Sequence, residues 1–295
     1  MNGKVLILVY LLIIFSSAMA VCYGQVPAVN DYAAGLATKL EPDKKVVYKI
    51  VKGRELRLHL FTPDSFRKGE RRPCFIAFHG GGWVNGEPRR FYPIVYEFVK
   101  RGMIGISAEY RFRDSAEGTT VFDCVRDGRS VVRYVRQHAK ELGVDPRQII
   151  VSGGSAGAHI AAGTALFDTV NEVTDAMDIS AMPNVLVLYY PVIDTSPEGY
   201  GANKIGEQWR KLSPLHNIKE GLPPTLLFHG TSDKVTPFKG AKNFKDAMIK
   251  AGNKCNLILK EGGIHGYMMF EKNYFEEAIS QTITFLESCG ITLNR

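Results

Sequence analysis

The sequence predicts an α/β fold built on a doubly wound, mostly parallel β-sheet with an antiparallel N-terminal edge. Two observations predict it: short, continuous apolar runs of strand length recur along the chain, and segments with one apolar helical face lie between them. A chain of 295 residues suits one such domain. Its 45% hydrophobic and 23% charged residues are typical of globular proteins and exclude a disordered chain, a collagen-like fibre and a coiled coil.

The first two strands are expected at Val46–Val51 and Leu56–Phe61, with a turn at Gly53 between them. In the second of these, leucine alternates with polar residues, which predicts a strand exposed to solvent on one face. Six later runs lack this alternation and are expected to be strands buried on both faces. They are Cys74–Phe78, Met103–Ala108, Ile149–Val151, Val185–Tyr190, Leu226–Phe228 and Leu257–Leu259.

Three segments place apolar residues at helical spacing, and they are Val121–Val135, Phe238–Met248 and Phe275–Leu286. A fourth stretch, Ala156–Leu166, is compatible with a helix. The segment Asp194–Asn217 has little periodicity and several glycines and prolines. We expect it to form a small cap over the C-terminal edge of the sheet, where α/β proteins bind ligands.

The net charge of +7 comes from lysines and arginines spread along the whole chain, with no dense basic run. This distribution argues against a nucleic-acid partner. The five cysteines form no Cys-x-x-Cys pair and no Cys/His pattern of metal spacing, so we expect no metal site. An oxidising compartment would allow a disulfide, but mostly buried free thiols are the favoured state.

The sharpest local signal is the run Gly153–Gly157 (GGSAG). It follows one predicted strand and precedes the helix-compatible stretch from Ala156, which is the strand–turn–helix context of a nucleophile elbow. Glycines on both sides of the serine remove side chains that would clash in so tight a turn, and a helix start favours a developing negative charge. We therefore predict that Ser155 is a nucleophile. The alternative is a plain glycine-rich turn.

A second glycine-rich run, His79–Trp83 (HGGGW), directly follows the first of the buried strands. A serine that attacks a carbonyl creates an oxyanion, which free backbone N–H groups must stabilise. The expected donors are the amides of Gly81 and Gly82, completed by that of Ala156. A phosphate-binding loop is disfavoured because no Lys-Ser/Thr pair follows. His79 itself is expected to make structural hydrogen bonds.

A serine nucleophile needs a general base, and the base needs an acid that orients it. Among the seven histidines, His265 lies in a glycine-rich loop after the last predicted strand, so it is expected to reach the C-terminal edge of the sheet. The loop after the preceding strand supplies Asp233 as the acid. Asp194, one strand earlier, is the competing acid. His159 and His229 are expected to have structural roles.

From Val46 to the C-terminus, the chain resembles esterases with the α/β-hydrolase fold. The group in question is similar to hormone-sensitive lipases and to bacterial acetylxylan and feruloyl esterases. The resemblance rests on His79–Trp83, Glu109-Tyr110-Arg111, Asp145-Pro146, Gly153–Gly157, Ser213-Pro214, His229–Asp233 and Gly263–Gly266. The chain departs from the pattern at Ala158, where a further glycine is common, and in having no large N-terminal helical cap.

The resemblance implies the same site as the motifs do. Its members are the nucleophile Ser155, the general base His265, the acid Asp233, and the oxyanion-hole residues Gly81, Gly82 and Ala156. It also implies a structural ion pair between Arg111 and Asp127. The order nucleophile, acid, base along the chain is that of α/β-hydrolases. No metal and no organic cofactor is expected, because such a triad supplies its own nucleophile and base.

The N-terminal sequence predicts a secretory signal peptide. Lys4 is followed by the apolar run Val5–Phe15 and by an Ala-x-Ala site that ends at Ala20, after which cleavage is expected. The run would span only about half of a bilayer core. An uncleaved anchor and a lipoprotein attached through Cys22 are the alternatives. The predicted domains are the signal peptide (1–20), an N-terminal segment (21–44) and one α/β-hydrolase catalytic domain (45–295), in a secreted or periplasmic protein with no stable membrane span after cleavage.

The resemblance implies hydrolysis of short-chain carboxylic esters, with a small ester or an acylated glycan as substrate. Deacetylation of a polysaccharide or oligosaccharide is favoured, because the signal peptide points to extracytoplasmic material. A general short-chain carboxylesterase and a non-catalytic hydrolase-fold binding protein are the alternatives, and a long-chain lipase is disfavoured because no long apolar lid appears. Aromatic residues near the predicted site loops could stack on sugars, although at least half are expected simply to pack. They are Trp83, Tyr110, Phe112, Tyr190, Trp209 and Tyr267.

Overall fold

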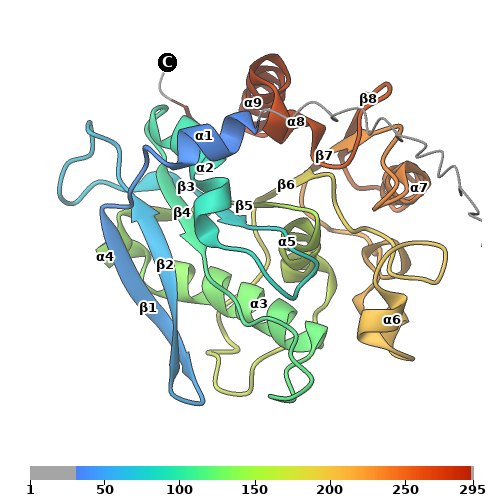
Figure 1. Cartoon of the computed structure of the whole chain (residues 1–295). Helices are drawn as coiled ribbons and strands as arrows, with labels where there is room; N and C mark the ends of the chain where they lie inside the picture. Colours follow the sequence, from blue (N-terminus) through green and yellow to red (C-terminus); the bar gives the residue numbers. More distant parts are fainter. Residues whose placement is uncertain (1–30, 294–295) are drawn as a thin grey trace, which may run out of the picture.

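Eight strands form the frame of the structure, a computed structural model that describes residues 31–293. They are β1 (Lys44–Val51), β2 (Arg54–Phe61), β3 (Arg72–Phe78), β4 (Ile104–Ala108), β5 (Val144–Gly154), β6 (Val185–Tyr189), β7 (Thr225–Gly230) and β8 (Cys255–Lys260). They pair in the order β1-β2-β4-β3-β5-β6-β7-β8 (Figure 1). The predicted signal peptide, its cleavage site and Cys22 lie outside the described residues.

All neighbouring strands are parallel except at β2, which is antiparallel to both β1 and β4. The turn between β1 and β2 consists of Lys52 and Gly53, whose φ angles are 50° and 78°. Positive φ at both central positions is typical of the tight hairpin turn whose twist matches that of the strands. The pairing confirms the predicted mostly parallel sheet with an antiparallel N-terminal edge.

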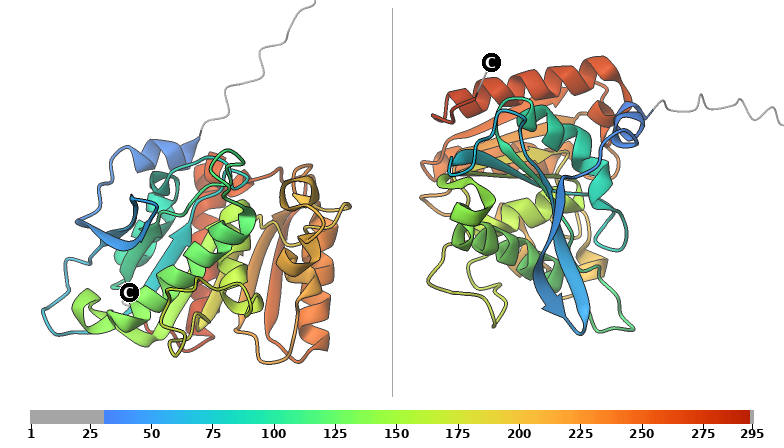
Figure 2. Two further views of the ribbon diagram at one scale, coloured as in Figure 1. Left: turned by 90° about the horizontal axis from the view of Figure 1, so that it is seen from below. Right: turned by 90° about the vertical axis from the view of Figure 1, so that its left-hand side faces the viewer.

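Helices cover both faces of the sheet (Figure 2). One face carries α3 (Val121–Gln137), α5 (Ala156–Leu166) and α7 (Phe238–Lys250), and the other carries α1 (Tyr32–Ala37), α2 (Tyr92–Val99), α8 (Tyr267–Phe270) and α9 (Lys272–Glu287). The shorter elements are α4 (Ala139–Leu142), α6 (Ala202–Ile205), and the 3-10 turns η1 (Pro88–Phe91), η2 (Trp209–Leu212) and η3 (Pro214–His216). The four helices expected from the sequence are therefore present as α3, α5, α7 and α9, and the sheet is doubly wound.

The central strands contribute side chains to two separate apolar cores, one on each face of the sheet. Along β3, Ile76 packs into the core beneath α3 and α5, whereas its neighbours Phe75 and Ala77 pack into the core beneath α2 and α9. Successive side chains of a strand point to opposite faces, so a strand buried on both faces must be apolar throughout. In the described part of the chain the cysteines are free thiols, as expected, and Cys74 and Cys124 are fully buried.

Two expectations about burial are wrong. His59 on β2 is buried rather than solvated, because its ring is held between the hydroxyl of Tyr92 and the carboxylate of Glu109. Strand β8 is half-exposed rather than buried on both faces, because it is the last strand of the sheet and pairs only with β7. Helix α2 was not identified from the sequence, because apolar residues occur nearly all round it.

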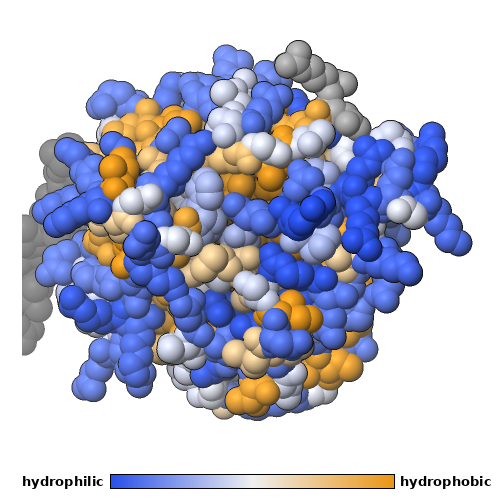
Figure 3. Space-filling model, turned by 180° about the vertical axis from the view of Figure 1, so that it is seen from behind, coloured by the Kyte–Doolittle hydropathy of each residue, from blue (hydrophilic) through white to orange (hydrophobic). Residues whose placement is uncertain are grey.

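Hydrophilic side chains cover most of the rear face of the molecule, and hydrophobic side chains form separate groups there (Figure 3). Single exposed apolar residues such as Val173 and Ile50 are common on the surfaces of folded proteins. Between residues 31 and 293, none of the helices has the length and apolar character needed to cross a membrane.

A buried ionic cluster ties β1 to α3 and to the segment after β4. Asp127 on α3 has a fully buried side chain, and it accepts hydrogen bonds from Arg111 (2.8 Å from both Nε and Nη2) and from Lys49 Nζ (2.7 Å). Glu172 supplies a second carboxylate, 2.9 Å from Lys49 Nζ and 3.0 Å from Arg111 Nη2. The expected pair of Arg111 and Asp127 is confirmed, and each of the two cations contacts both of these carboxylates.

Replacing Asp127 by alanine should lower the free energy of unfolding by about 3 kcal/mol or more, because it leaves buried positive charge without its main partner. Urea unfolding followed by circular dichroism measures this. Asp246→Ala is the matched control, since Asp246 is exposed and lies 3.7 Å from Lys245, and it should change stability by less than about 1 kcal/mol. Similar losses in the two variants would contradict the assignment of the cluster as a stabilising element.

Candidate active site

Four loops meet at the C-terminal edge of the parallel strands. They follow β3, β5, β7 and β8. After β3 the chain winds toward one side of the sheet, and after β5 toward the other, although β3 and β5 are neighbours. Such a switch point, outside the carboxyl ends of the strands, is where open α/β sheets bind ligands.

The loop after β5 is a sharp strand–turn–helix. Ser155 has φ 55° and ψ −120°, a strained conformation for a residue with a side chain, and α5 begins directly after it. A Cβ atom on Gly157 would lie 2.2 Å from the carbonyl oxygen of Phe78, and one on Gly153 would lie 2.5 Å from the carbonyl carbon of Gly157. Both glycines are therefore required for the turn to close, as the motif predicted.

The structure brings the three predicted triad residues together. His265 Nε2 lies 3.0 Å from Ser155 Oγ, and His265 Nδ1 lies 2.7 Å from Asp233 Oδ2. Since a carboxylate only accepts hydrogen bonds, Nδ1 carries the proton and Nε2 presents its lone pair to the serine hydroxyl. This arrangement suits removal of the serine proton by the imidazole. The catalytic roles of the three residues stay a prediction.

Asp233 is held by its own loop. Its Oδ1 accepts hydrogen bonds from the amides of Val235 (2.8 Å) and Thr236 (2.9 Å), and its Oδ2 accepts one from Thr236 Oγ1 (2.9 Å). Burial raises the pKa of Asp233, but hydrogen bonds from His229, His265 and the Thr236 amide outweigh it and hold the pKa well below its ordinary value. Asp233 therefore stays ionised beside the imidazole.

Thr236 is a site residue that the sequence reasoning missed. Its hydroxyl lies 2.9 Å from Asp233 Oδ2 and 3.2 Å from His265 Nδ1, so it fixes the carboxylate against the ring. The available signal was a threonine three residues after the aspartate, a spacing typical of side-chain turns. That pattern is common in loops, which is why it is weak evidence on its own.

The loop after β3 and the start of α5 together place three amides near Ser155. Within the described residues, the N–H groups of Gly81, Gly82 and Ala156 donate to no protein acceptor. Gly81 and Gly82 have φ angles of 122° and 60°, which favour glycine. Unused amides beside a serine can stabilise negative charge that develops on a carbonyl oxygen.

The neighbouring histidines have structural contacts. His79 Nδ1 donates to the carbonyl oxygen of Gly80 (2.7 Å), and burial lowers the pKa of His79 to about 4. His159 Nε2 donates to the carbonyl oxygen of Leu212 (2.6 Å), and burial likewise lowers the pKa of His159 to about 4. His229 on β7 donates through Nε2 to the Thr236 carbonyl oxygen (2.6 Å).

A cavity of about 530 Å³ opens above Ser155 and His265. Apolar side chains line much of it, including Phe91, Tyr190, Met269 and Phe270. The ring of Tyr190 meets that of His265 edge to face, with 4.9 Å between their centroids. This volume is within the range of small-molecule sites, roughly 300–1,000 Å³.

Of the six aromatic residues considered for sugar stacking, only Tyr190 lines this cavity. Trp83, Tyr110 and Tyr267 are buried in packing contacts, as expected for at least half of the set. Phe112 lies beside His79, with 5.8 Å between ring centroids. Trp209 lines a neighbouring pocket.

The competing acid Asp194 lies in that neighbouring pocket. Its Oδ1 is 4.0 Å from Nδ1 of His216, and Asp233 rather than Asp194 contacts His265. The segment that follows β6 also contributes Tyr200 and Lys204, which the sequence reasoning did not single out. Lys204 Nζ lies 2.7 Å from Tyr200 Oη and 3.3 Å from the carbonyl oxygen of Gly82, so this segment contacts the loop after β3.

Residues 58–248 match the family model BD-FAE. Among curated proteins, the chain is 27% identical over 237 residues to a probable isoprenylcysteine alpha-carbonyl methylesterase ICMEL1 of Arabidopsis thaliana, covering 71% of this chain and 48% of that protein. It is 26% identical over 220 residues to esterase LipQ of Mycobacterium tuberculosis, covering 68% and 51%. It is 25% identical over 229 residues to endo-1,4-beta-xylanase B of Butyrivibrio fibrisolvens, covering 73% and 36%. The chain thus spans about half, or less, of the length of these relatives.

Among solved structures, Thermogutta terrifontis esterase 2 phosphoramylated by tabun is 38% identical with a TM-score of 0.80, covering 84% of this chain and 95% of that one. The propionate-bound form of the esterase from the same organism is 37% identical with a TM-score of 0.79 and the same coverage. Together with the sheet order, this similarity confirms the predicted α/β-hydrolase fold of esterases.

Replacing Asp233 by asparagine should make stability less sensitive to acid. The pKa of Asp233 is depressed in the folded state, so its carboxylate contributes stability that is fully present above the ordinary aspartate pKa of about 3.9 and is lost as the pH falls through the folded-state pKa. The stability difference between wild type and Asp233→Asn should therefore be largest from about pH 5 to 7 and should shrink toward about pH 3.

Urea unfolding over this pH series measures the difference. Asp246→Asn, at an exposed position, is the control and should differ little from wild type throughout. A difference between wild type and Asp233→Asn that stays constant across the series would contradict a depressed pKa in the folded protein.

Proposed function

Since the chain belongs to the BD-FAE family, we propose that it is a serine esterase that hydrolyses short-chain carboxylic esters through Ser155, His265 and Asp233. One observation carries this proposal: an unbroken hydrogen-bond chain from Ser155 Oγ through the imidazole to the carboxylate, at the floor of a cavity. Nucleophile, base and orienting acid within hydrogen-bond reach are the signature of covalent catalysis by serine.

In the proposed reaction, His265 Nε2 takes the hydroxyl proton as Ser155 Oγ bonds to the ester carbonyl carbon. The tetrahedral intermediate then collapses, the bond to the alcohol oxygen breaks, and the imidazolium returns the proton to the departing alcohol. A water molecule attacks the acyl-enzyme with the same histidine as base, which releases the acid and restores the serine. Asp233 stays ionised throughout and stabilises the imidazolium.

The amides of Gly81, Gly82 and Ala156 are proposed to hold the oxyanion of both intermediates. They are free of protein acceptors within residues 31–293, so they need no rearrangement when the charge develops. Each such donor typically contributes about 100- to 1,000-fold in rate. Their positions at the start of α5 and in the loop after β3 put positive partial charge on one side of the serine.

For the substrate, we propose an acetylated polysaccharide or oligosaccharide outside the cytoplasm. One prediction from the sequence and two observations support it. The chain begins with a predicted signal peptide, one relative is named as an endo-1,4-beta-xylanase, and a related esterase has been solved with propionate and with butyrate bound. The first indicates an extracytoplasmic location, the second plant-type glycan, and the third a short acyl group.

A general short-chain carboxylesterase of small esters is the second candidate. It is favoured by the methylesterases among the relatives and by the largely apolar wall of the cavity around Phe91, Met269 and Phe270. In both candidates the chemistry at Ser155 is the same, and only the alcohol differs.

Replacing Ser155 by alanine should lower kcat for p-nitrophenyl acetate by about 10⁴- to 10⁶-fold, since the attacking oxygen is lost. A fluorophosphonate probe should label wild type and leave Ser155→Ala unlabelled. Ser152→Ala is the matched control: Ser152 lies on β5, the strand that leads to Ser155, and within the described part of the chain its buried hydroxyl has no partner. Folded wild type that resists labelling would indicate a non-catalytic binding protein.

A panel of esters distinguishes the two substrate candidates. Hydrolysis of each ester is measured with the mature chain that is expected after cleavage at Ala20. If the substrate is a glycan, acetate release from acetylated xylo-oligosaccharides should exceed hydrolysis of aryl acetates in kcat/KM. If aryl and alkyl acetates are hydrolysed well and acetylated saccharides are not, the carboxylesterase assignment replaces the glycan assignment.

A further inference from the structure

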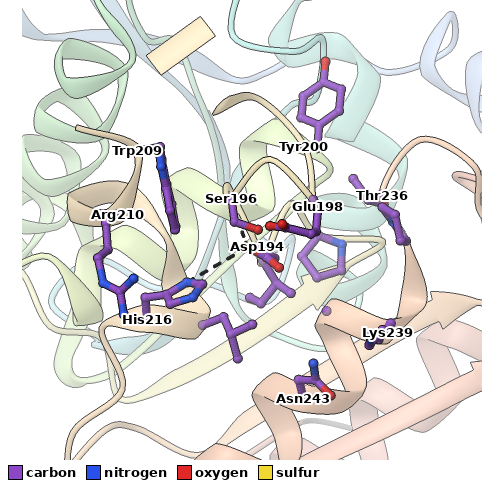
Figure 4. Close-up of a pocket in the computed structure, with 16 residues that line it drawn as sticks. Asp194, Ser196, Glu198, Tyr200, Trp209, Arg210, His216, Thr236, Lys239 and Asn243 are labelled. Atoms are coloured by element: carbon purple, nitrogen blue, oxygen red, sulfur yellow. Dashed lines mark hydrogen bonds and ion pairs between the residues drawn. The ribbon is translucent and has the colours of Figure 1, made fainter. Parts of the chain in front are cut away.

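A second pocket, of about 460 Å³, lies beside the catalytic cavity and shares Tyr200 with it (Figure 4). Its walls come from the segment that follows β6 and from the start of α7. Apart from Thr236, which contacts Asp233 and His265, the other side chains that line it have no part in the proposed ester chemistry at Ser155. The polar and aromatic ones include Asp194, Glu198, Trp209, Arg210, Lys239 and Asn243.

The wall of this pocket is held by hydrogen bonds of its own. Asp194 Oδ1 accepts from the Ser196 amide (2.9 Å), and the Asp194 carbonyl oxygen accepts from the Tyr200 amide (2.9 Å). Thr195 Oγ1 donates to the carbonyl oxygen of Trp209 (2.9 Å), which ties this turn to η2. The pocket is therefore preformed, and a ligand would not have to order it.

The side chains leave both acceptors and donors for a ligand. Asp194 Oδ2 has no hydrogen-bond partner among residues 31–293, and the carboxylate lies near His216, to which the dashed line in Figure 4 runs. The carboxylates of Asp194 and Glu198 and the cationic side chains of Arg210 and Lys239 all line the pocket. With two charges of each sign, the pocket favours neither a strongly anionic nor a strongly cationic ligand.

Trp209 adds an aromatic wall. Its side chain is only partly buried, and in Figure 4 the ring is seen on edge, with Arg210 on one side and Ser196 on the other. An aromatic face beside fixed carboxylate, amide and cationic groups matches a sugar ring, which has apolar C–H faces and a rim of hydroxyls that both donate and accept.

We propose that this pocket is a subsite that binds a sugar unit next to the unit that carries the ester. The inference rests on the proposed function, because it assigns the alcohol part of the substrate to a saccharide of at least two units. The two cavities are close enough for one ligand: Tyr200 borders both, and Val235 of the catalytic cavity directly precedes Thr236 and Pro237 of the second pocket.

The test compares three substrates: p-nitrophenyl acetate, acetylated xylose and acetylated xylotriose. Trp209→Ala should lower kcat/KM for acetylated xylotriose about tenfold, mainly through KM, and should leave the other two substrates unchanged. Asn243→Ala should act in the same direction with a smaller effect. It should leave folding unchanged, because Asn243 is exposed on α7.

Gln208→Ala and Lys242→Ala are the matched controls. Each is exposed, adjoins a tested residue in sequence and lies outside the pocket wall, so each should behave as wild type on all three substrates. A second readout is binding of unacetylated xylotriose to Ser155→Ala by calorimetry, which should weaken about tenfold when Trp209→Ala is added.

The outcomes separate the subsite from the proposed function. If wild type hydrolyses p-nitrophenyl acetate but releases no acetate from either saccharide, the glycan assignment fails and the subsite fails with it. If wild type deacetylates xylotriose and both pocket variants do so equally well, the subsite is wrong and the glycan assignment stands. Equal losses on all three substrates would mean that Trp209 has only a structural role, which also overturns the inference.

Discussion

Close backbone packing between the loops after β3 and β5 is the constraint on which the site depends. These strands are parallel neighbours in which Phe78 pairs with Gly153, so their loops leave the sheet side by side. A Cβ atom on Gly157 would lie 2.2 Å from the Phe78 carbonyl oxygen, and one on Gly80 would lie 3.1 Å from that of Gly154. With glycine at these positions, the turn of Ser155 and the amides of the His79–Trp83 loop can share one cavity. A serine on a looser turn would lie away from those amides.

A second pair of neighbouring strands, β7 and β8, repeats this arrangement. A Cβ atom on Gly230 would lie 2.1 Å from the carbonyl oxygen of Gly263, and the Ser232 amide donates to that same oxygen (3.0 Å). This contact brings the aspartate loop against the histidine loop. The end of β6 joins the two pairs, because the Ser155 amide donates to the Tyr189 carbonyl oxygen (3.0 Å) and the Tyr190 amide to that of Phe228 (2.8 Å). The imidazole of His265 therefore connects Asp233, in the second pair of loops, to Ser155, in the first pair. The sheet fixes the distance between these two pairs of loops.

Much of this frame could be predicted because its signals are local. Buried parallel strands are continuous apolar runs, and loops that pack backbone against backbone need glycines at fixed offsets from them. The burial of His59 could not be predicted, because it depends on Tyr92 and Glu109, which are 33 and 50 residues away in the sequence. The half-exposure of β8 likewise depends on its being the last strand. The catalytic roles, the domain boundaries and the secretion signal stay predictions, since geometry alone does not test them.

The segment after β6 lacks such local signals, yet it borders both cavities and is anchored to the frame. One of its anchors is the hydrogen bond from His159 Nε2 to the Leu212 carbonyl oxygen, which requires a protonated Nε2 but not a charged ring. Because burial lowers the pKa of His159 to about 4, the ring is neutral at neutral pH, and its single N–H is committed to this bond. The anchor therefore does not titrate where esters are usually assayed. Hence a pH dependence of ester hydrolysis above about pH 5 would not arise from loss of this hydrogen bond.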